Sequence, residues 1–250
     1  MIKYSSISFT TNSLAAIIPV GNGLAGSPKA WVSLRRAGDM AVIENGENPR
    51  RKALFSHLGL ERYSVLTLKQ VHSKKVYSIN EETKIPKEGD GLITSISNIL
   101  LGVTVADCLP IYLYAERSKV IGILHSGWKG TGITGEAVKL MKERYRCSPE
   151  EIFITIGPGI GVCCYSVPEE RAESFARNWG EETVKYKGGV YYLDMVKANL
   201  KILSQNDINN ITVIRDCTCC NEYLGSFRRE GHKSFTRMLA IVGFISRRGD

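Results

Sequence analysis

The residues of this chain best suited to chemistry lie in three short segments. They are Lys69-Gln70-Val71-His72-Ser73, Ala106-Asp107-Cys108-Leu109-Pro110 and His125-Ser126-Gly127-Trp128. Each segment places one metal-ligating side chain at the end of an apolar run, and these side chains are His72, Cys108 and His125. Two imidazoles and one thiolate leave a fourth tetrahedral position open, which is typical of a catalytic zinc. If the three side chains converge in space, the pattern indicates an enzyme.

The spacing of these residues along the chain does not by itself require a shared site. Taken singly, His72 would be a polar strand-end residue and Cys108 a small buried apolar side chain. All three follow predicted strands, however, and functional sites collect at the strand ends of open α/β sheets. Asp107 is the natural base or proton shuttle beside a metal-activated water. The alternative is that Asp107 caps the turn before Pro110.

Two further groups of residues could bind an anion. The glycine-rich loop over residues 127–132 follows His125 directly and precedes a helical pattern. Free N–H groups at a helix N-terminus attract phosphate, and Lys129 would add positive charge. Near the C-terminus, Arg228, Arg229 and Arg237 offer guanidinium groups that suit phosphate or carboxylate. The alternatives are an ordinary helix start and a solvated charged turn.

The elements that must position these residues alternate between strand and helix patterns. The run over 99–105 is apolar throughout, as expected for a strand buried on both faces, and it leads to Asp107 and Cys108. After His125 the apolar spacing changes to that of a helix. Strands are predicted at 64–68, 76–79, 92–94, 99–105, 111–114, 120–124, 152–156, 211–214 and 238–245, and helices at 50–58, 133–145, 169–179 and 193–203.

Length and composition favour one folded domain spanning residues 1–250. The chain has 43% hydrophobic and 23% charged residues, which is ordinary for a soluble protein. No apolar run approaches the ~20 residues of a membrane helix, and no signal peptide is recognisable, so we expect a cytoplasmic protein that does not bind membranes. The net charge of +8 comes from scattered basic groups, which argues against a nucleic-acid groove and for a small anionic ligand.

The seven cysteines are an odd number for a disulfide framework. A second, structural zinc at Cys163-Cys164 and Cys217-Thr218-Cys219-Cys220 is one reading of the remaining thiols. The spacing is not taken to fit a CxxC pair, however, and adjacent cysteines do not easily ligate one tetrahedral ion. We therefore favour thiols that line the interior or the rim of the site.

Seven motifs, in their order, resemble those of the YfiH-like family, also called the laccase-domain or polyphenol oxidase family. The resemblance runs from about Leu34 to the C-terminus. Three of the motifs are the opening segments, the third of which continues to Lys129-Gly130-Thr131. The other four are Gly89-Asp90-Gly91-Leu92-Ile93-Thr94, Gly157-Pro158-Gly159-Ile160, Asp216-Cys217-Thr218 and Phe227-Arg228-Arg229-Glu230-Gly231.

The resemblance implies a mixed α/β (α+β) fold in which mixed β-sheets are flanked by helices, like the cytotoxic-necrotizing-factor catalytic domain. It implies a zinc site at His72, Cys108 and His125. It also implies phosphorolysis of purine nucleosides (adenosine, inosine, guanosine and methylthioadenosine) and deamination of adenosine.

On this basis the expected partners are purine nucleosides and phosphate, and the protein is expected to be a monomer or small homo-oligomer. The expected catalytic residues are Asp107, Cys108 and His125. The expected substrate-binding residues are Gln70, Lys129, Arg229 and Arg237.

Three other functions remain open at this point. A metal-free cysteine hydrolase or amidase would use Cys108 as nucleophile and His125 or His72 as base. A copper-dependent polyphenol oxidase would need more copper ligands than a three-residue set provides. A binding module for anionic ligands would need no chemistry at all.

Overall fold

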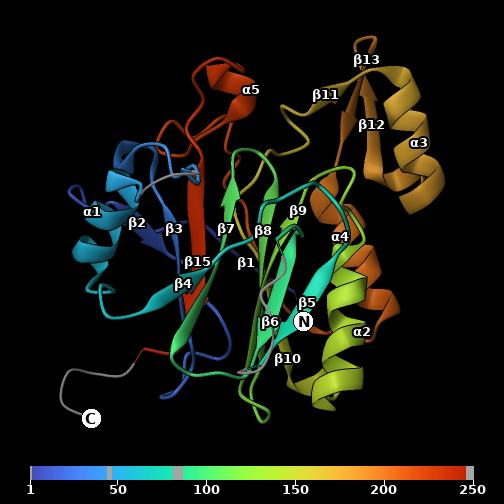
Figure 1. Cartoon of the computed structure of the whole chain (residues 1–250). Helices are drawn as coiled ribbons and strands as arrows, with labels where there is room; N and C mark the ends of the chain where they lie inside the picture. The colour runs from blue at the N-terminus through green and yellow to red at the C-terminus, as the bar shows by residue number, and fades with distance from the viewer. Residues whose placement is uncertain (1, 44–46, 81–86, 246–250) are drawn as a thin grey trace.

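Two stacked β-sheets form the centre of the protein, as shown by a computed structural model that describes residues 2–43, 47–80 and 87–245 (Figure 1). The larger sheet has seven strands in the order β1-β14-β10-β8-β9-β6-β5. It is mixed, because β1, β14 and β10 run parallel, as do β6 and β5, whereas β8 and β9 pair antiparallel with their neighbours. The bounds are β1 (Ile2–Ser5), β14 (Asn210–Ile214), β10 (Ile152–Ile156), β8 (Leu109–Ala115), β9 (Val120–Ser126), β6 (Gly91–Thr94) and β5 (Val76–Ile79).

The second sheet has five strands in the order β2-β3-β15-β7-β4. All its pairs are antiparallel except that of β4 with β7. Its strands are β2 (Ala15–Ile17), β3 (Lys29–Ser33), β15 (Met238–Gly243), β7 (Ile99–Val105) and β4 (Ser64–Leu66).

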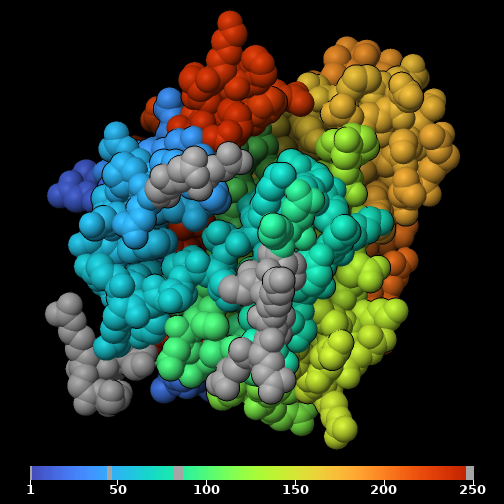
Figure 2. Space-filling model, viewed as in Figure 1, coloured from blue at the N-terminus to red at the C-terminus, as the bar shows by residue number. Residues whose placement is uncertain are grey.

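Helices cover the outer face of each sheet, so the protein has four layers (Figure 1). α2 (Ile133–Tyr145) and α4 (Met195–Gln205) pack on the seven-stranded sheet, and α1 (Pro49–Leu58) packs with the 3-10 turn Arg35–Ala37 on the five-stranded sheet. α3 (Glu169–Trp179) and a three-stranded sheet form a lobe at the upper right of Figure 2. That sheet contains β11 (Ser166–Val167), β13 (Val190–Leu193) and β12 (Val184–Lys187). The remaining elements are α5 (Phe227–Glu230) and the 3-10 turns Pro149–Glu151 and Glu181–Thr183.

The period-two alternation of side chains explains why the sheets stack. In β8, Ile111 and Leu113 face the helices, whereas Tyr112 and Tyr114 face the second sheet. In β7, Leu101 and Val103 lie between the sheets, and Leu100 faces α1 on the other side. The prediction that residues 99–105 form a strand buried on both faces is therefore confirmed.

The predicted mixed α/β fold is confirmed, and five elements have the predicted bounds: β5, β7, β10, α2 and α3. The hairpin of β12 and β13 was missed. It turns at Gly188 and Gly189, whose φ angles of 58° and 77° suit a two-residue turn that other residues rarely adopt. Among the described residues, no helix combines the length and the apolar character that crossing a bilayer requires.

The arrangement of strands brings the three opening segments to one edge of the stacked sheets. β7 ends at Val105, the chain crosses to the other sheet, and β8 begins at Leu109. Because β8 and β9 are antiparallel, the first residue of β8 pairs with Ser126 at the end of β9. Cys108 and His125 are therefore neighbours at this edge.

Ile123 in β9 tests the contribution of the inter-sheet core, because its side chain has no exposed surface. Replacing it by alanine leaves a cavity between two sheets that cannot collapse onto each other, which should cost about 2–5 kcal/mol of unfolding free energy. Ile17→Ala in β2 is the matched control, because Ile17 is 66% exposed. Urea denaturation should show a clear midpoint decrease for Ile123→Ala alone, and equal midpoints would contradict this packing.

Candidate functional site

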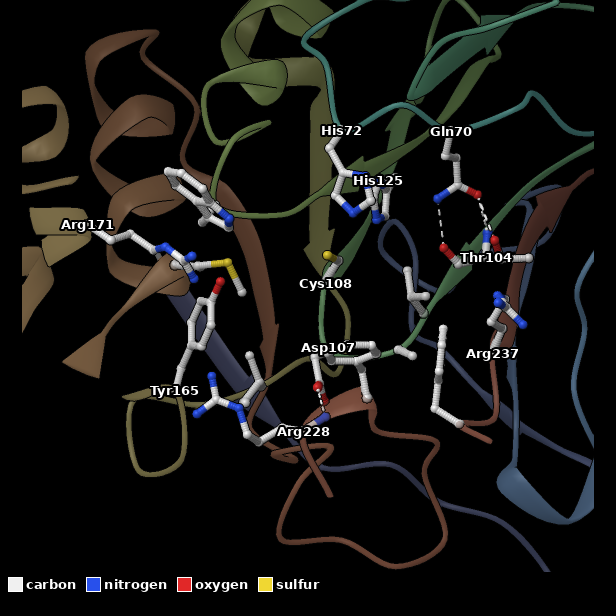
Figure 3. Close-up of a pocket in the computed structure, with 17 residues that line it drawn as sticks. Gln70, His72, Thr104, Asp107, Cys108, His125, Tyr165, Arg171, Arg228 and Arg237 are labelled. Carbon is white, nitrogen blue, oxygen red and sulfur yellow. Dashed lines mark hydrogen bonds between the residues drawn. The ribbon is translucent and has the colours of Figure 1, made fainter. Parts of the chain in front are cut away.

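The three predicted metal ligands converge. The ligand atoms of His72, Cys108 and His125 all lie within 4.8 Å of one another. The two imidazole rings meet edge to face, with centroids 4.7 Å apart and an interplanar angle of 79°. The sulfur of Cys108 points toward the two rings (Figure 3). This group could hold a metal ion and leave a position open for a substrate or water.

The carboxylate of Asp90 fixes two of the three ligands. Its Oδ1 accepts hydrogen bonds from the backbone N–H of His72 at 3.0 Å and from Nδ1 of His125 at 2.9 Å. Its Oδ2 accepts from the N–H groups of Val71 and Ser73 and from the Ser73 hydroxyl. Three successive N–H groups around one anion hold His72 in the left-handed region, at φ 58°. Because Nδ1 of His125 is bonded to Asp90, its Nε2 is left to face Cys108.

Burial and mutual contacts shift the pKa values of these groups in opposite directions. Burial alone would raise the pKa of Asp90, but hydrogen bonds from His125 and Ser73 lower it to about 2. Burial would lower the pKa of His125, but bonds to Asp90 and Cys108 raise it to about 9. Burial would raise the pKa of Cys108, but the two imidazoles lower it to about 7. The site therefore favours a thiolate, which is the form that a metal ligand or a nucleophile requires.

The sulfur of Cys108 packs against Gly127, where the absence of a side chain makes room for it. A Cβ atom on Gly127 would lie 2.7 Å from this sulfur and 3.4 Å from Cδ2 of His72. The first distance is well inside van der Waals contact. A side chain at this position would therefore displace one ligand of the group.

The three ligands open onto a cavity of about 540 Å³, a size typical of small-molecule sites (Figure 3). Its walls combine aromatic and aliphatic side chains with three arginines. Besides the three ligands, the lining residues are Gln70, Thr104, Val105, Ala106, Asp107, Trp128, Ile160, Tyr165, Arg171, Met195, Phe227, Arg228, Phe235 and Arg237.

Two of the expected substrate-binding residues line this cavity. The amide of Gln70 is held by Thr104 of β7, since it accepts from the N–H and hydroxyl of Thr104 and donates to its carbonyl. Arg237 donates to the carboxylate of Asp39 at 2.7 Å, so that part of its charge is neutralised. Figure 3 shows Gln70 and Arg237 on the side of the cavity opposite Arg171.

The structure does not place the other two, Lys129 and Arg229, on this cavity. The ammonium of Lys129 lies 5.5 Å from the Trp128 ring and borders a separate, smaller hollow. The guanidinium of Arg229 instead donates to backbone carbonyls of the neighbouring loop, among them those of Cys219 and Asn221. Lys129 is exposed and Arg229 lies behind the cavity wall, so neither lines this cavity, and their expected contact with the substrate stays a prediction.

Asp107 lines the cavity but is bonded to its wall. Its φ of 87° is in the left-handed region. Its Oδ1 accepts from the Thr218 hydroxyl and its Oδ2 from the N–H of Arg228, both at 2.7 Å. The carboxylate thus anchors the C-terminal loop that carries Arg228.

Two further cavity residues, Arg171 and Tyr165, were not predicted from the sequence. Arg171 stacks on Trp128 with 4.6 Å between guanidinium and ring, and no ion pair of the described residues involves it. Arg228 lies over Tyr165 at 5.6 Å and donates to the Ser166 hydroxyl. Tyr165 itself keeps its proton, because burial and the nearby Cys108 raise its pKa to about 12. Arg228 was among the arginines noted in the sequence, whereas nothing local distinguishes Arg171 from the other charges of α3.

Comparison with known proteins gives consistent results. The family described as "Multi-copper polyphenol oxidoreductase laccase" matches residues 39–245. The chain is 34% identical over 214 residues to the purine nucleoside phosphorylase YlmD of Geobacillus stearothermophilus, covering 78% of this chain and 77% of that protein. It is 36% identical over 180 residues to a purine nucleoside phosphorylase of Clostridium acetobutylicum, covering 70% and 75%.

Solved structures show the same fold. The crystal structure of YlmD from Geobacillus stearothermophilus superposes with a TM-score of 0.83 at 27% identity, covering 96% of this chain and 99% of that one. The crystal structure of the Bacillus licheniformis protein YfiH gives a TM-score of 0.79 at 25% identity, covering 91% and 99%.

Asp90→Asn tests the anchoring of the ligands. The amide keeps the size of the carboxylate but replaces one acceptor oxygen by an N–H2 donor and removes the charge. We expect affinity for a divalent metal to fall about 10- to 100-fold, as for other groups that orient metal ligands. Asp207→Asn is the control, because Asp207 is exposed and its left-handed φ of 62° suits asparagine. Equal affinities of the two variants in a competition titration would contradict this role.

Gly127→Ala tests the space beside the thiolate. The added methyl group must push the Cys108 sulfur away, so the variant should lose most of its bound metal while remaining folded. Gly135→Ala in α2 is the matched control, because its Cβ would meet only Ile202 at 3.2 Å and Asn206 at 3.9 Å. Metal content and circular dichroism measured together check this, and full metal content in Gly127→Ala would refute it.

Proposed function

Because the chain belongs to the multi-copper polyphenol oxidoreductase laccase family and its relatives are named purine nucleoside phosphorylases, we propose that it is a zinc-dependent purine nucleoside phosphorylase. Its substrates would be adenosine, inosine, guanosine or methylthioadenosine together with phosphate, and it would also deaminate adenosine. One observation carries the proposal: a His-Cys-His group and the guanidinium of Arg171, which forms no ion pair with the residues that the structure describes, open onto one cavity with aromatic walls.

Zinc fits the residues present. His72, Cys108 and His125 are borderline and soft donors, and the low pKa of Cys108 favours the deprotonated form that a metal requires. When bound there, zinc would act as a Lewis acid and lower the pKa of a water molecule.

Arg171 and Arg228 would bind the phosphate. A guanidinium group recognises phosphate oxygens with paired N–H donors. Arg171 is fixed by stacking on Trp128 and keeps its charge available. Arg228 lies on the same side of the cavity as Arg171, and its backbone N–H donates to the carboxylate of Asp107 (Figure 3). In this proposal Asp107 therefore positions the phosphate-binding loop rather than moving a proton.

The aromatic walls would hold the purine. Trp128, Tyr165, Phe227 and Phe235 offer ring faces, and the two phenylalanines contact each other edge to face with centroids 5.0 Å apart. Flat purines stack on such rings with little dependence on their substituents, which would allow the site to accept several nucleosides. The protonated phenol of Tyr165 is an uncharged donor beside these rings.

In phosphorolysis, a phosphate oxygen forms a bond to the ribose anomeric carbon and the bond from this carbon to the purine nitrogen breaks. The purine leaves with the bonding electrons and gains a proton, and ribose 1-phosphate remains. The chain's contribution is to align the phosphate with the anomeric carbon and to donate a hydrogen bond from Tyr165 toward the leaving base. In deamination, water replaces the purine amino group and ammonia leaves.

A metal-free cysteine hydrolase is the second candidate, because one observation favours it. The thiol of Cys108 lies against two imidazoles that lower its pKa to about 7, as in cysteine nucleophiles paired with histidine. Copper-dependent oxidation is the third, and the family's description suggests it.

A nucleoside panel assayed with and without phosphate tests the proposal. Inosine should give hypoxanthine only when phosphate is present, and Cys108→Ala and His125→Ala should lose this activity together with bound zinc. Activity that survives complete zinc removal would instead support the cysteine hydrolase, and oxidation that needs added copper would support the oxidase.

Arg171→Gln tests the phosphate site. Loss of a charged hydrogen-bond donor worth about 1.5–3 kcal/mol should lower kcat/KM for phosphate about 10- to 100-fold. Arg177→Gln in the same helix is the control, because Arg177 is an exposed residue whose side chain pairs with Glu173. Steady-state kinetics at varied phosphate check this, and equal values for the two variants would remove Arg171 from the proposed site.

A further inference from the structure

Four cysteine sulfurs gather outside the cavity. The Sγ atoms of Cys163, Cys164, Cys217 and Cys220 all lie within 4.8 Å of one another. The Sγ of Cys220 is 3.7 Å from that of Cys163 and 3.3 Å from that of Cys164. All seven cysteines are free thiols. This cluster shares no residue with the His72, Cys108 and His125 group.

Sheet topology brings the two cysteine pairs together. β10 and β14 are parallel neighbours, so the loops that follow them leave the same edge of the sheet. Cys163 and Cys164 lie in the loop after β10, and Cys217 and Cys220 lie in the loop after β14. The loops are joined where the N–H of Thr218 donates to the carbonyl of Gly159.

The sequence argument against a shared ion does not hold. Cys217 and Cys220 are separated by two residues, which is the spacing that commonly contributes two ligands to a zinc site. The adjacent Cys163 and Cys164 both reach the cluster, because the N–H groups of Cys164 and Tyr165 bond to the carbonyl of Gly161 and fold the loop into a tight turn.

The distances fit a tetrahedral tetrathiolate ion. Zinc–sulfur bonds of about 2.3 Å at tetrahedral angles separate the sulfurs by about 3.8 Å. The observed 3.7 Å separation matches this value, and the 3.3 Å separation needs only a small rotation of a side chain. We propose that Cys163, Cys164, Cys217 and Cys220 bind a second metal ion, a structural zinc.

Gly161 supports this site in two ways. Its N–H donates to the Cys217 sulfur at 3.2 Å, a contact that stabilises a thiolate. A Cβ atom at this position would lie 3.2 Å from the Cys163 sulfur and 3.6 Å from the Cys217 sulfur. The glycine therefore lets the backbone approach the cluster closely enough to donate.

Two guanidinium groups bond to the loops that supply the ligands, and one of them, that of Arg229, also pairs with Glu230 at 3.1 Å. Four thiolates and one Zn²⁺ carry a net charge of −2. Arg229 donates to the carbonyls of Thr218, Cys219 and Asn221, and so surrounds the loop that supplies two ligands. Arg228 donates to the carbonyl of Cys164 in the other loop. These bonds hold the half-buried side chain of Arg229 at this loop and away from the cavity.

The second metal would stabilise one wall of the cavity. Four protein ligands close its coordination, which is the mark of a structural rather than a catalytic zinc. Tyr165 follows Cys164 directly, and Arg228 donates to the carbonyl of Cys164, so a metal at the cluster would fix both cavity residues. This inference stands independently of the reaction proposed above.

Metal content of the purified protein tests the inference. We expect two zinc ions per chain. Cys220→Ser should lose one and keep the other, Cys108→Ala should show the reverse pattern, and the control Cys147→Ala should keep both. Cobalt substitution in Cys108→Ala should give the intense charge-transfer absorption of a tetrathiolate site.

A second measurement uses the unaltered protein, in case the serine variant does not fold. Four thiols beyond Cys108 should resist a thiol reagent until a strong chelator removes the metal. A single zinc per chain with these thiols freely reactive would overturn the inference, and so would a disulfide between the two loops in freshly purified protein. Two zinc ions without phosphorolysis would leave the second site standing while refuting the proposed function.

Discussion

The buried carboxylate of Asp90 is the constraint on which the candidate site depends. A buried charge without partners would cost several kcal/mol, and Asp90 avoids this cost by accepting bonds from the backbone and hydroxyl groups around His72 and from the ring of His125 at the same time. One group thus sets the positions of two ligands that lie far apart in the sequence. The left-handed conformation of His72, unfavourable for a residue with a side chain, persists because these bonds require it.

Most of the fold could be predicted from the sequence because its elements have strong periodic patterns. The buried strand β7 and the amphipathic helices α2 and α3 show this clearly. The β12–β13 hairpin also carried a usable signal, since two aromatic and β-branched runs flank Gly188-Gly189. Pairing of the strands into two sheets could not be read in the same way, because it depends on contacts between distant segments.

The site was predictable to a lesser extent. Motif positions identified His72, Cys108 and His125, yet not Asp90, whose function depends on which backbone groups surround it. Arg228 and Arg229 show the limit most directly, because adjacent residues of a short helix point to opposite sides of one loop. The side chain of Arg228 lines the cavity, whereas that of Arg229 donates to backbone carbonyls of the loop after β14. Only tertiary structure separates the two roles.

The antiparallel register of β8 and β9 has a consequence for changes in chain length. Pro110 pairs with His125, and the turn of this hairpin lies at the far end of both strands, at residues 116–119. Successive residues of a strand face opposite sides, so deleting one residue within β9 would turn His125 away from Cys108. Insertions at the turn leave the register intact. We expect natural and engineered length variation in this hairpin to be confined to residues 116–119, because Cys108 and His125 lie at the opposite end of the two strands.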